Sequence, residues 1–291
     1  MNQSVSLGQL VTLACNLECS IPKVGNVHRG ADFESTTLYD FLVSGSVFGN
    51  MIDSEKSASL GKIILESVKA TKRAVGQNTN LGIILLIAPL VNAHRGRPDQ
   101  RLSSAVVANV LKQATVDDTT LVFEAIRLAA AGGLGEVEEN NVNDREYPQI
   151  DLLTAMQQAS NRDLIARQFA NGFADLFELV IPAIDRKLAD GKGLPVAVHG
   201  AHIEILARLG DTLILRKCGQ RAFDHAQMLA KKCVDAIRRS ESEFVFAAGE
   251  LDFWLRSDSN RRNPGSTADL IAAALFVKLV NDGIESLGPL S

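Results

Sequence analysis

Hydrophobic residues recur at helical spacing through most of the chain. The first such segment opens with Ser6 and Gln9, which have the spacing of a helix capping box, and its apolar positions follow at intervals of three and four up to Leu17. A helix from about Ser6 to Cys19 is therefore predicted. The same periodicity predicts further helices near residues 36–43, 57–75, 81–88, 118–131, 151–189, 196–209, 226–237 and 271–280.

Two features of this pattern indicate how the helices are arranged. The run Leu81 to Ala88 is hydrophobic nearly all round, so it should be a helix buried among others, with Pro89 ending or kinking it. Pro182 should divide the 151–189 segment into two helical pieces. No pair of alternating strands is joined by a hairpin turn, and no segment repeats at a fixed period. We predict an all-α, multi-helix bundle that forms a single domain over residues 1–291.

Composition agrees with a helical, globular protein. Of the 291 residues, 46% are hydrophobic, 22% are charged and only 5% are aromatic, which favours helix over strand and excludes a disordered chain. The formal net charge is −4, from 30 basic and 34 acidic residues. This balance gives no reason to expect a nucleic acid or an anionic membrane as partner, but it allows a local basic pocket.

No segment predicts export or a membrane span. The first twenty residues lack a basic region followed by a long apolar core, and the most apolar stretch, Leu81 to Val91, is about half the roughly 20 residues that cross a bilayer. The four cysteines (Cys15, Cys19, Cys218 and Cys233) form no C-x-x-C pair, and we expect them to be reduced and partly buried. We expect a cytoplasmic protein, and a homo-oligomer is compatible with the sequence.

Several familiar site patterns are absent or incomplete. Gly132 to Gly135 follows a helix and lacks the G-x-G-x-x-G spacing, so it is better explained as a helix stop that leads into the polar stretch Gly133 to Tyr147, a candidate linker or lid. Neither the P-loop pattern nor G-x-S-x-G occurs. His199 and His202 could ligate a metal, but H-E-x-x-H is absent and packed or capping histidines are favoured.

Three predicted helix starts have a composition suited to phosphate. Lys23 to Arg29 combines cationic side chains with a flexible backbone, Asn78 to Asn80 opens the buried helix, and Asn263 to Asp269 opens the final helix just after two arginines. A helix N-terminus exposes unpaired N–H groups and the positive end of the helix dipole, which attract an anion. Ordinary capping, with Ser266 as N-cap, is the alternative for each segment.

Carboxylates near these segments suggest a metal-bound nucleotide. Asp211 and Thr212 lie shortly before Arg216 and Lys217, so an acid that can hold Mg²⁺ is followed by two cations that can hold phosphate. Asp269 lies one turn inside the last helix. Because Mg²⁺ usually takes one or two protein carboxylates together with phosphate oxygens, Asp211 and Asp269 are candidate ligands for Mg²⁺ bound with ATP. Solvated charge at helix ends is the alternative.

Together these blocks resemble the triphosphoribosyl-dephospho-CoA synthase family, the CitG-like proteins. The similarity is carried by four segments in the family's order, spread over about 250 residues. They are Pro22 to Arg29, Gly76 to Gly82, Asp211-Thr212 with Arg216-Lys217, and Asn263 to Leu270.

The resemblance implies an all-α transferase of cofactor biosynthesis. Such an enzyme transfers the 5-triphosphoribosyl group of ATP to a ribose hydroxyl of 3′-dephospho-CoA and releases adenine. Positive charge then develops at the anomeric carbon and the acceptor hydroxyl needs a base, two tasks suited to carboxylates. The resemblance implies Asp211 and Asp269 at the metal or the reacting ribose. It implies that the phosphorylated substrates contact Lys23, Asn26, His28, Arg29, Asn78, Thr79, Asn80, Thr212, Arg216, Lys217, Asn263, Gly265 and Ser266.

One departure from the family pattern bears on the acceptor. Members that act on dephospho-CoA carry Asn-Thr-His-Lys-Gly where this chain has Asn78-Thr79-Asn80-Leu81-Gly82. The form seen here resembles a subgroup of archaea and C1-metabolising bacteria, which implies a related enzyme of tetrahydromethanopterin- or methanofuran-type cofactor synthesis with another phosphorylated substrate. A non-catalytic helical binding or scaffold protein is the competing class, and it predicts an exposed apolar surface.

Overall fold

The computed structural model describes residues 5–130 and 149–290, and within them it is built from helices with no sheet. The first half contains α1 (Leu7–Ser20), α2 (Leu38–Ser54), α3 (Leu60–Val75), α4 (Leu81–Gly96), α5 (Ser104–Leu111) and α6 (Val116–Ala130). The second half contains α7 (Leu152–Ala159), α8 (Leu164–Ala170), the π-helix η1 (Leu176–Val180), α9 (Ile181–Ala189), α10 (Leu194–Leu209), α11 (Thr212–Cys218), α12 (Gln220–Ile237), α13 (Glu241–Arg256), α14 (Gly265–Asp282) and the 3₁₀ turn η2 (Ile284–Leu287). The predicted all-α class is confirmed.

Two helix ends that the sequence predicted are confirmed by their caps. The Ser6 hydroxyl accepts a hydrogen bond from the Gln9 amide (3.1 Å) and the Gln9 side chain accepts one from the Ser6 amide (2.8 Å), so the expected capping box opens α1. Gly76 ends α3 in the left-handed conformation, with φ of 81°, as a C-terminal glycine commonly does.

Of the two proline predictions, the one at Pro89 needs correction. α4 does not end at Pro89 but continues to Gly96, because α4 is enclosed by neighbouring helices whose packing outweighs one missing hydrogen bond. Pro182 lies in the first turn of α9, directly after the boundary between η1 and α9, so the prediction that it divides two helical pieces is confirmed. Further breaks in the 151–189 segment fall between α7 and α8 and before η1.

Three helices were not predicted from the hydrophobic pattern. α5 and α11 span only 8 and 7 residues, too few to display a helical period. α13 is longer, but it leaves Val245, Phe246 and Phe253 between 63% and 76% exposed, so its apolar residues do not form one buried stripe.

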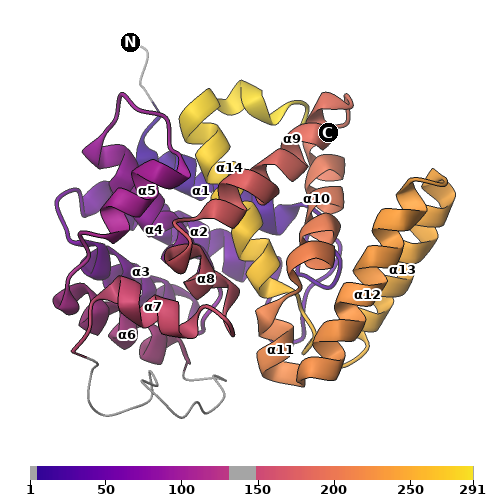
Figure 1. Ribbon diagram of the computed structural model, residues 1–291, viewed down its shortest axis with the longest axis horizontal. Helices are drawn as coiled ribbons and strands as arrows, with labels where there is room; N and C mark the ends of the chain where they lie inside the picture. Colours follow the sequence, from indigo (N-terminus) through magenta and orange to yellow (C-terminus); the bar gives the residue numbers. More distant parts are fainter. Residues whose placement is uncertain (1–4, 131–148, 291) are drawn as a thin grey trace.

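The core is centred on two helices that are buried on nearly all sides. α4 is enclosed as its sequence predicted, and Leu270 to Leu279 of α14 are at most 6% exposed. α14 packs against α1, α4 and α10 and runs through the middle of the molecule (Figure 1). The N-terminus of α14 is therefore fixed deep within the fold.

A second, smaller cluster of apolar side chains is formed by α10 to α13 together with Val24. α12 and α13 make an antiparallel pair at one edge of the molecule (Figure 1), while α10 contributes to both clusters and joins them. The stretch 133–147, the predicted linker or lid, lies outside the described residues. None of the helices in the described parts of the chain has the length and apolar content to cross a membrane.

Candidate active site

A cavity of about 870 Å³, which we call the cleft, opens where the starts of several helices meet. Its volume lies in the range of small-molecule sites, roughly 300–1,000 Å³. One part of its wall is apolar and comes from α2, α4, α6, α7, α8 and the segment before α2: Phe33, Phe41, Leu81, Leu85, Phe123, Ile126, Met156 and Ile165. The polar part includes Glu18, Asn26, Asn78, Thr79, Asp163, Arg216, Lys217, Arg261, Asn263, Ser266 and Asp269.

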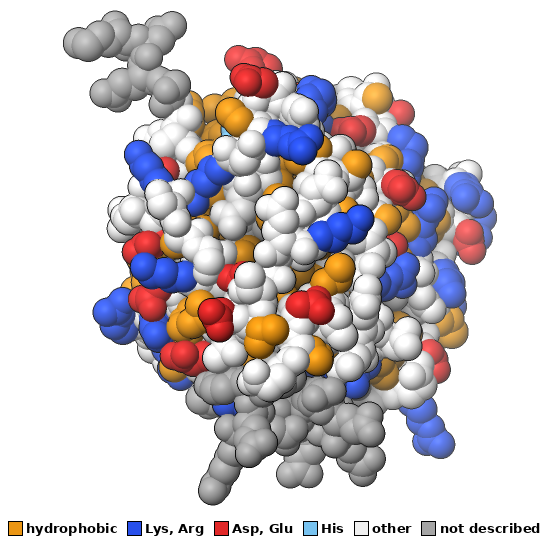
Figure 2. Space-filling view, turned by 60° about the vertical axis from the view of Figure 1, so that its left-hand side comes forward, with side chains coloured by type: hydrophobic (Ala, Val, Ile, Leu, Met, Phe, Trp, Pro, Cys, Tyr) orange, Lys and Arg blue, Asp and Glu red, His pale blue; other side chains and the backbone are white. Residues whose placement is uncertain are grey.

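Three cationic side chains of the cleft lie on α11 and on the segment before α14, and Lys72 and Arg162 also line it. Arg216 forms an ion pair with Asp163, the Lys217 ammonium donates to the Asn263 side chain (3.1 Å), and the Arg261 guanidinium donates to the Lys217 carbonyl (3.1 Å). Elsewhere, the face drawn in Figure 2 shows acidic and basic side chains interspersed, without a broad patch of one sign. Positive charge is thus gathered locally, in a protein of net charge −4.

Two long helices, α4 and α14, point their N-termini at the cleft. The cleft is lined by Asn78 to Gly82, excluding Asn80, at the start of α4, and by Gly265 and Ser266 at the start of α14. The shorter α8 and α11 begin at the same place, since Asp163 and Leu213 also line the cleft. Unpaired N–H groups and positive helix-dipole ends therefore converge with the cations, an arrangement that favours an anion such as phosphate.

Asp211 holds these helix starts together and does not line the cleft. It is 1% exposed, caps α11 through the amides of Leu213 (2.9 Å) and Ile214 (3.4 Å), and accepts the Thr267 amide of α14 (2.8 Å). Burial raises the pKa of Asp211, and these N–H groups oppose the shift. The predicted catalytic and metal-binding residue is thus placed as a structural clamp between two helices.

Thr212 extends the clamp, and it too does not line the cleft. Its hydroxyl accepts the Leu164 amide (2.9 Å) at the start of α8 and lies 3.4 Å from the Ser266 hydroxyl. The sequence block Asp211-Thr212 therefore fixes the relative positions of α8, α11 and α14. These helices carry one share of the polar part of the cleft, which includes Arg216, Lys217, Ser266 and Asp269.

Asp269, by contrast, presents its carboxyl group to the cleft. Gly82 of α4 lies against it, since a Cβ atom on Gly82 would be 2.0 Å from Asp269 Oδ2 and 2.6 Å from Cγ. No hydrogen bond to this carboxyl group is found among the described residues. Burial, with a smaller effect from the charge of Glu18, holds the pKa of Asp269 well above its ordinary value.

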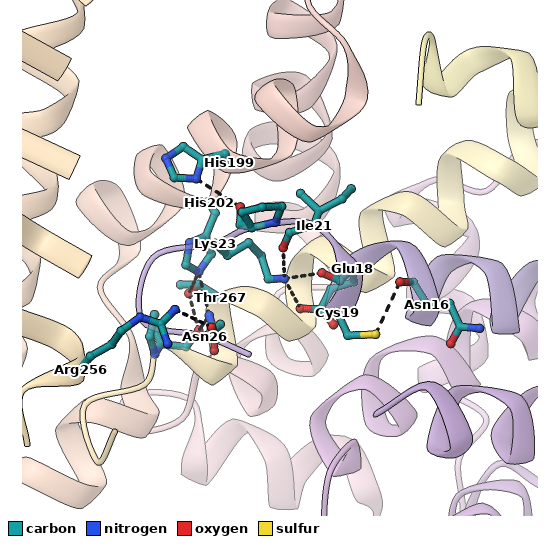
Figure 3. A network of polar contacts seen from close by, with 12 residues as sticks. Asn16, Glu18, Cys19, Ile21, Lys23, Asn26, His199, His202, Arg256 and Thr267 are labelled. Atoms are coloured by element: carbon teal, nitrogen blue, oxygen red, sulfur yellow. Dashed lines mark hydrogen bonds and ion pairs between the residues drawn. The ribbon is translucent and has the colours of Figure 1, made fainter. Parts of the chain in front are cut away.

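Of the predicted phosphate-binding residues in the loop between α1 and α2, one is buried in the interior and two lie nearer the surface. Lys23 is 1% exposed: its ammonium group pairs with the Glu18 carboxylate (3.1 Å) and donates to the carbonyls of Glu18 and Ile21 (Figure 3). All three protons are therefore used inside the protein. His28 and Arg29 lie nearer the surface and do not line the cleft.

Asn26 connects this loop to the start of α14. Its amide donates to the Pro264 carbonyl (3.2 Å) and lies 3.4 Å from His202 Nε2, which is also 3.0 Å from the Thr267 hydroxyl (Figure 3). The Thr267 hydroxyl also donates to the Pro264 carbonyl (2.9 Å), so these four residues form one buried polar network. Burial lowers the pKa of His202 to about 3. His199 is also held in the fold, through the Pro22 carbonyl (3.1 Å).

Nine of the predicted site residues thus line one cleft, although they are far apart in sequence. They are Asn26, Asn78, Thr79, Arg216, Lys217, Asn263, Gly265, Ser266 and Asp269. The other six lie outside the lining: Lys23, His28, Arg29, Asn80, Asp211 and Thr212.

Sequence reasoning missed Glu18 and Asp163, two acids of the cleft. Glu18 belongs to the periodic pattern of α1, in which one acid gives no local signal. Asp163 is the N-cap of α8, and the signal that could have identified it is an aspartate just before an apolar run.

Three acids in and beside the cleft already have partners within the protein. Glu18 is paired with Lys23, Asp163 with Arg216, and both oxygens of Asp211 accept backbone amides. No group of three or more His, Cys, Asp or Glu side chains suited to a metal occurs in residues 5–130 and 149–290. The donor set suits Mg²⁺ only as a companion of a phosphorylated substrate, with most ligands from phosphate and water.

Fold and cleft together define an all-helical protein with a small-molecule site that has a cationic, helix-capped end and an apolar wall. The particular family follows from comparison with known sequences: residues 4–286 match the model of the CitG family, described as ATP:dephospho-CoA triphosphoribosyl transferase. The chain belongs to this family, whose members are transferases of cofactor biosynthesis.

Individual relatives carry the same description. A Pseudomonas syringae protein that bears the name 2-(5''-triphosphoribosyl)-3'-dephosphocoenzyme-A synthase is 27% identical over 69% of this chain, and the match covers 64% of that relative. A Pseudomonas fluorescens protein of the same name is 26% identical, with 90% of this chain and 86% of the relative covered. A crystal structure described as a triphosphoribosyl-dephospho-CoA synthase from Archaeoglobus fulgidus matches with a TM-score of 0.62 and 26% identity, over 83% of this chain and 98% of that one.

Proposed function

We propose that this protein transfers the 5-triphosphoribosyl group of ATP to a hydroxyl group of 3′-dephospho-CoA, with release of adenine. The observation that supports this best is the convergence of Arg216, Lys217 and the N-terminus of α14 on one cleft together with the apolar wall. The cations and the helix N-terminus suit a triphosphate, and the apolar wall suits a flat base. Family membership supplies the reaction type.

In this proposal the cationic end of the cleft binds the triphosphate. Arg216 and Lys217 offer charge-assisted hydrogen bonds, while the amides at Gly265 and Ser266 add the helix-dipole attraction. Asn78 and Thr79 lie at the start of the opposing helix α4 and contact the nucleotide from there. Mg²⁺ enters with ATP and neutralises phosphate charge, and its protein ligands are not supplied by Asp211. Because ATP is the donor, we place the reaction in the cytoplasm.

Asp269 is assigned to the reacting centre. Glycosyl transfer requires proton movement at both ends of the reaction, because the acceptor hydroxyl loses a proton and the departing base gains one. Burial favours the protonated form of Asp269, so this carboxyl group is suited to donate. Asp211 keeps a role of position, since it fixes the start of the helix that carries Asp269.

The test is direct detection of adenine. Purified protein is incubated with ATP, Mg²⁺ and 3′-dephospho-CoA, and adenine and the adduct are separated by liquid chromatography with mass detection. Adenine formed in equal amount to the adduct supports the proposal. Absence of both products overturns it, and a thermal shift with Mg-ATP then separates a different enzyme from a non-catalytic binding protein, because a ligand at a hundred times its Kd stabilises by about 2.7 kcal/mol.

A second candidate acceptor is favoured by Leu81. This residue lines the cleft at the start of α4, so the wall is apolar there. The family pattern of dephospho-CoA-acting members has a lysine at the position of Leu81. An acceptor with less negative charge at that point, such as an intermediate of a C1-carrier cofactor, would suit the apolar surface. Retained binding of Mg-ATP without adenine release in the presence of dephospho-CoA, followed by release with such an acceptor, would favour this alternative.

A further inference from the structure

We propose that Glu18 is the general base of the reaction, that Lys23 is its positioning residue, and that Asp269 is the partner acid. This inference rests on the proposed function, and it deepens it by assigning a catalytic residue that the sequence motifs did not suggest.

The first support is the position of Glu18. It belongs to the last turns of α1, is 5% exposed and lines the same cleft as Asp269 of α14. α1 and α14 pack against each other, so the two carboxyl groups reach the cleft from neighbouring helices. The charge of Glu18 contributes to the raised pKa of Asp269, which is consistent with this closeness.

The second support is that the two carboxyl groups have different partners in the protein. Glu18 Oε1 is held by the Lys23 ammonium at 3.1 Å, and Lys23 is itself anchored by the carbonyls of Glu18 and Ile21 (Figure 3). Asp269 has neither a paired cation nor a hydrogen-bond donor among the described residues. Burial raises the pKa of both carboxyl groups, but the Lys23 cation opposes the shift at Glu18, whereas the pKa of Asp269, which has no paired cation, is held well above its ordinary value. Two carboxyl groups whose environments separate them in this way are suited to act as base and acid.

The third support is the arrangement of Lys23. Its three donors all point to Glu18 and to the turn after it, and none is left for a phosphate. Such an ammonium group fixes one carboxylate oxygen. The other, Glu18 Oε2, accepts no hydrogen bond from the described residues and remains available to a substrate hydroxyl.

The reaction can be written so that atoms and charges balance. The bond between the ribose anomeric carbon and the adenine nitrogen of ATP breaks, and a bond from that carbon to the acceptor oxygen forms. The acceptor proton passes to Glu18, and the Asp269 proton passes to adenine. Protonated Glu18 and ionised Asp269 then return to their starting forms through one proton transfer within the cleft.

The groups that act on this pair are few. Glu18 is affected by burial and by Lys23, while Asp269 is affected by burial, by the acids Glu18, Asp211 and Asp163, and by Arg216. Cys15 and Cys19 lie on the same helix as Glu18, and burial raises the pKa of both thiols, to about 12 for Cys19. The thiols therefore stay neutral, and the acid limb of a pH–rate profile reports Glu18.

The experiment measures adenine release in wild type, Glu18→Gln, Lys23→Met and the double variant Glu18→Gln/Lys23→Met. Glu250→Gln, on an exposed position of α13 outside the cleft, is the control. The double variant removes both charges together, so neither is left buried alone. We expect it to fold, to bind Mg-ATP as wild type does, and to release adenine 10²- to 10⁴-fold more slowly. The control should match wild type.

The pH profile supplies a readout that a merely structural role would not move. Without the Lys23 cation, the ionised form of Glu18 is less favoured, so Lys23→Met should shift the acid limb of kcat/KM to higher pH. A folded double variant within tenfold of wild-type turnover, or an acid limb unmoved by Lys23→Met, overturns the assignment while the proposed function stands. Absence of adenine release from wild type overturns the proposed function, and this assignment with it.

Discussion

Replacing Gly82 with alanine tests whether the position of the Asp269 carboxyl group decides activity. The added Cβ would lie 2.0 Å from Asp269 Oδ2, whereas ordinary contact begins near 3.4 Å. The carboxyl group must therefore retreat by at least about 1 Å, and a displacement of that size at a reacting group costs roughly 100-fold in rate. Because Gly82 also lies inside α4, alanine gains helix propensity of about 1 kcal/mol, which offsets part of the repacking cost.

The assay pairs turnover with stability. We expect kcat for adenine release to fall about 100-fold in Gly82→Ala while Tm shifts by only a few degrees. Gly96→Ala is the matched control, because Gly96 ends the same helix, is exposed and has nothing within 4 Å of an added Cβ. It should keep full activity and gain at most about 1 kcal/mol. Wild-type turnover in folded Gly82→Ala would refute the assignment of Asp269 to the reacting centre.

Three further predictions follow from contacts in and around the cleft. Lys217→Ala and Arg216→Ala should each raise the Kd of Mg-ATP about tenfold in calorimetry, because each variant loses a charge-assisted contact to phosphate. Unchanged binding by both variants would show that the triphosphate does not bind at the cationic end of the cleft. Asn26→Ala should lower the free energy of unfolding by about 1 kcal/mol in urea titration, since the buried Pro264 carbonyl loses one of its donors and keeps the Thr267 hydroxyl; an unchanged midpoint would contradict this. His202 stays neutral in the folded protein but gains a proton on unfolding between about pH 6.5 and its folded pKa of about 3, so stability falls as the pH drops through this window. His202→Gln should remove up to about 5 kcal/mol of that dependence, and an unchanged slope of Tm against pH would oppose it.

Some of the helices that frame the cleft could be predicted because their signals are local. The capping box at Ser6, the glycine stop at Gly76 and the apolar run at α4 each depend on neighbouring residues, and all are confirmed. Short α5 and α11, and α13 with its exposed phenylalanines, were missed because none displays a clean helical stripe. Hydrophobic periodicity identifies a helix only when the helix is long and buries one face.

The sequence also determined which segments carry the site. The blocks at Asn78, at Arg216 and at Asn263 to Asp269 all contribute to the cleft lining. At Asn78 and Asn263 the polar residues before an apolar run place a helix N-terminus there, whereas Arg216 lies in the last turn of α11. What it did not determine is the direction of individual side chains. Lys23 looks like a phosphate ligand in sequence, yet it is buried against Glu18.

Only the tertiary structure decided the surroundings of each acid in and beside the cleft. Asp211, Asp269 and Glu18 are each one acid beside or inside a predicted helix, and sequence gives no reason to distinguish them. Packing turns Asp211 toward backbone amides, supplies Glu18 with a cation and leaves Asp269 in the cleft. These surroundings come from residues up to about 250 positions apart, and the burial and charge that set each carboxyl group's protonation exist only once the helices are packed together.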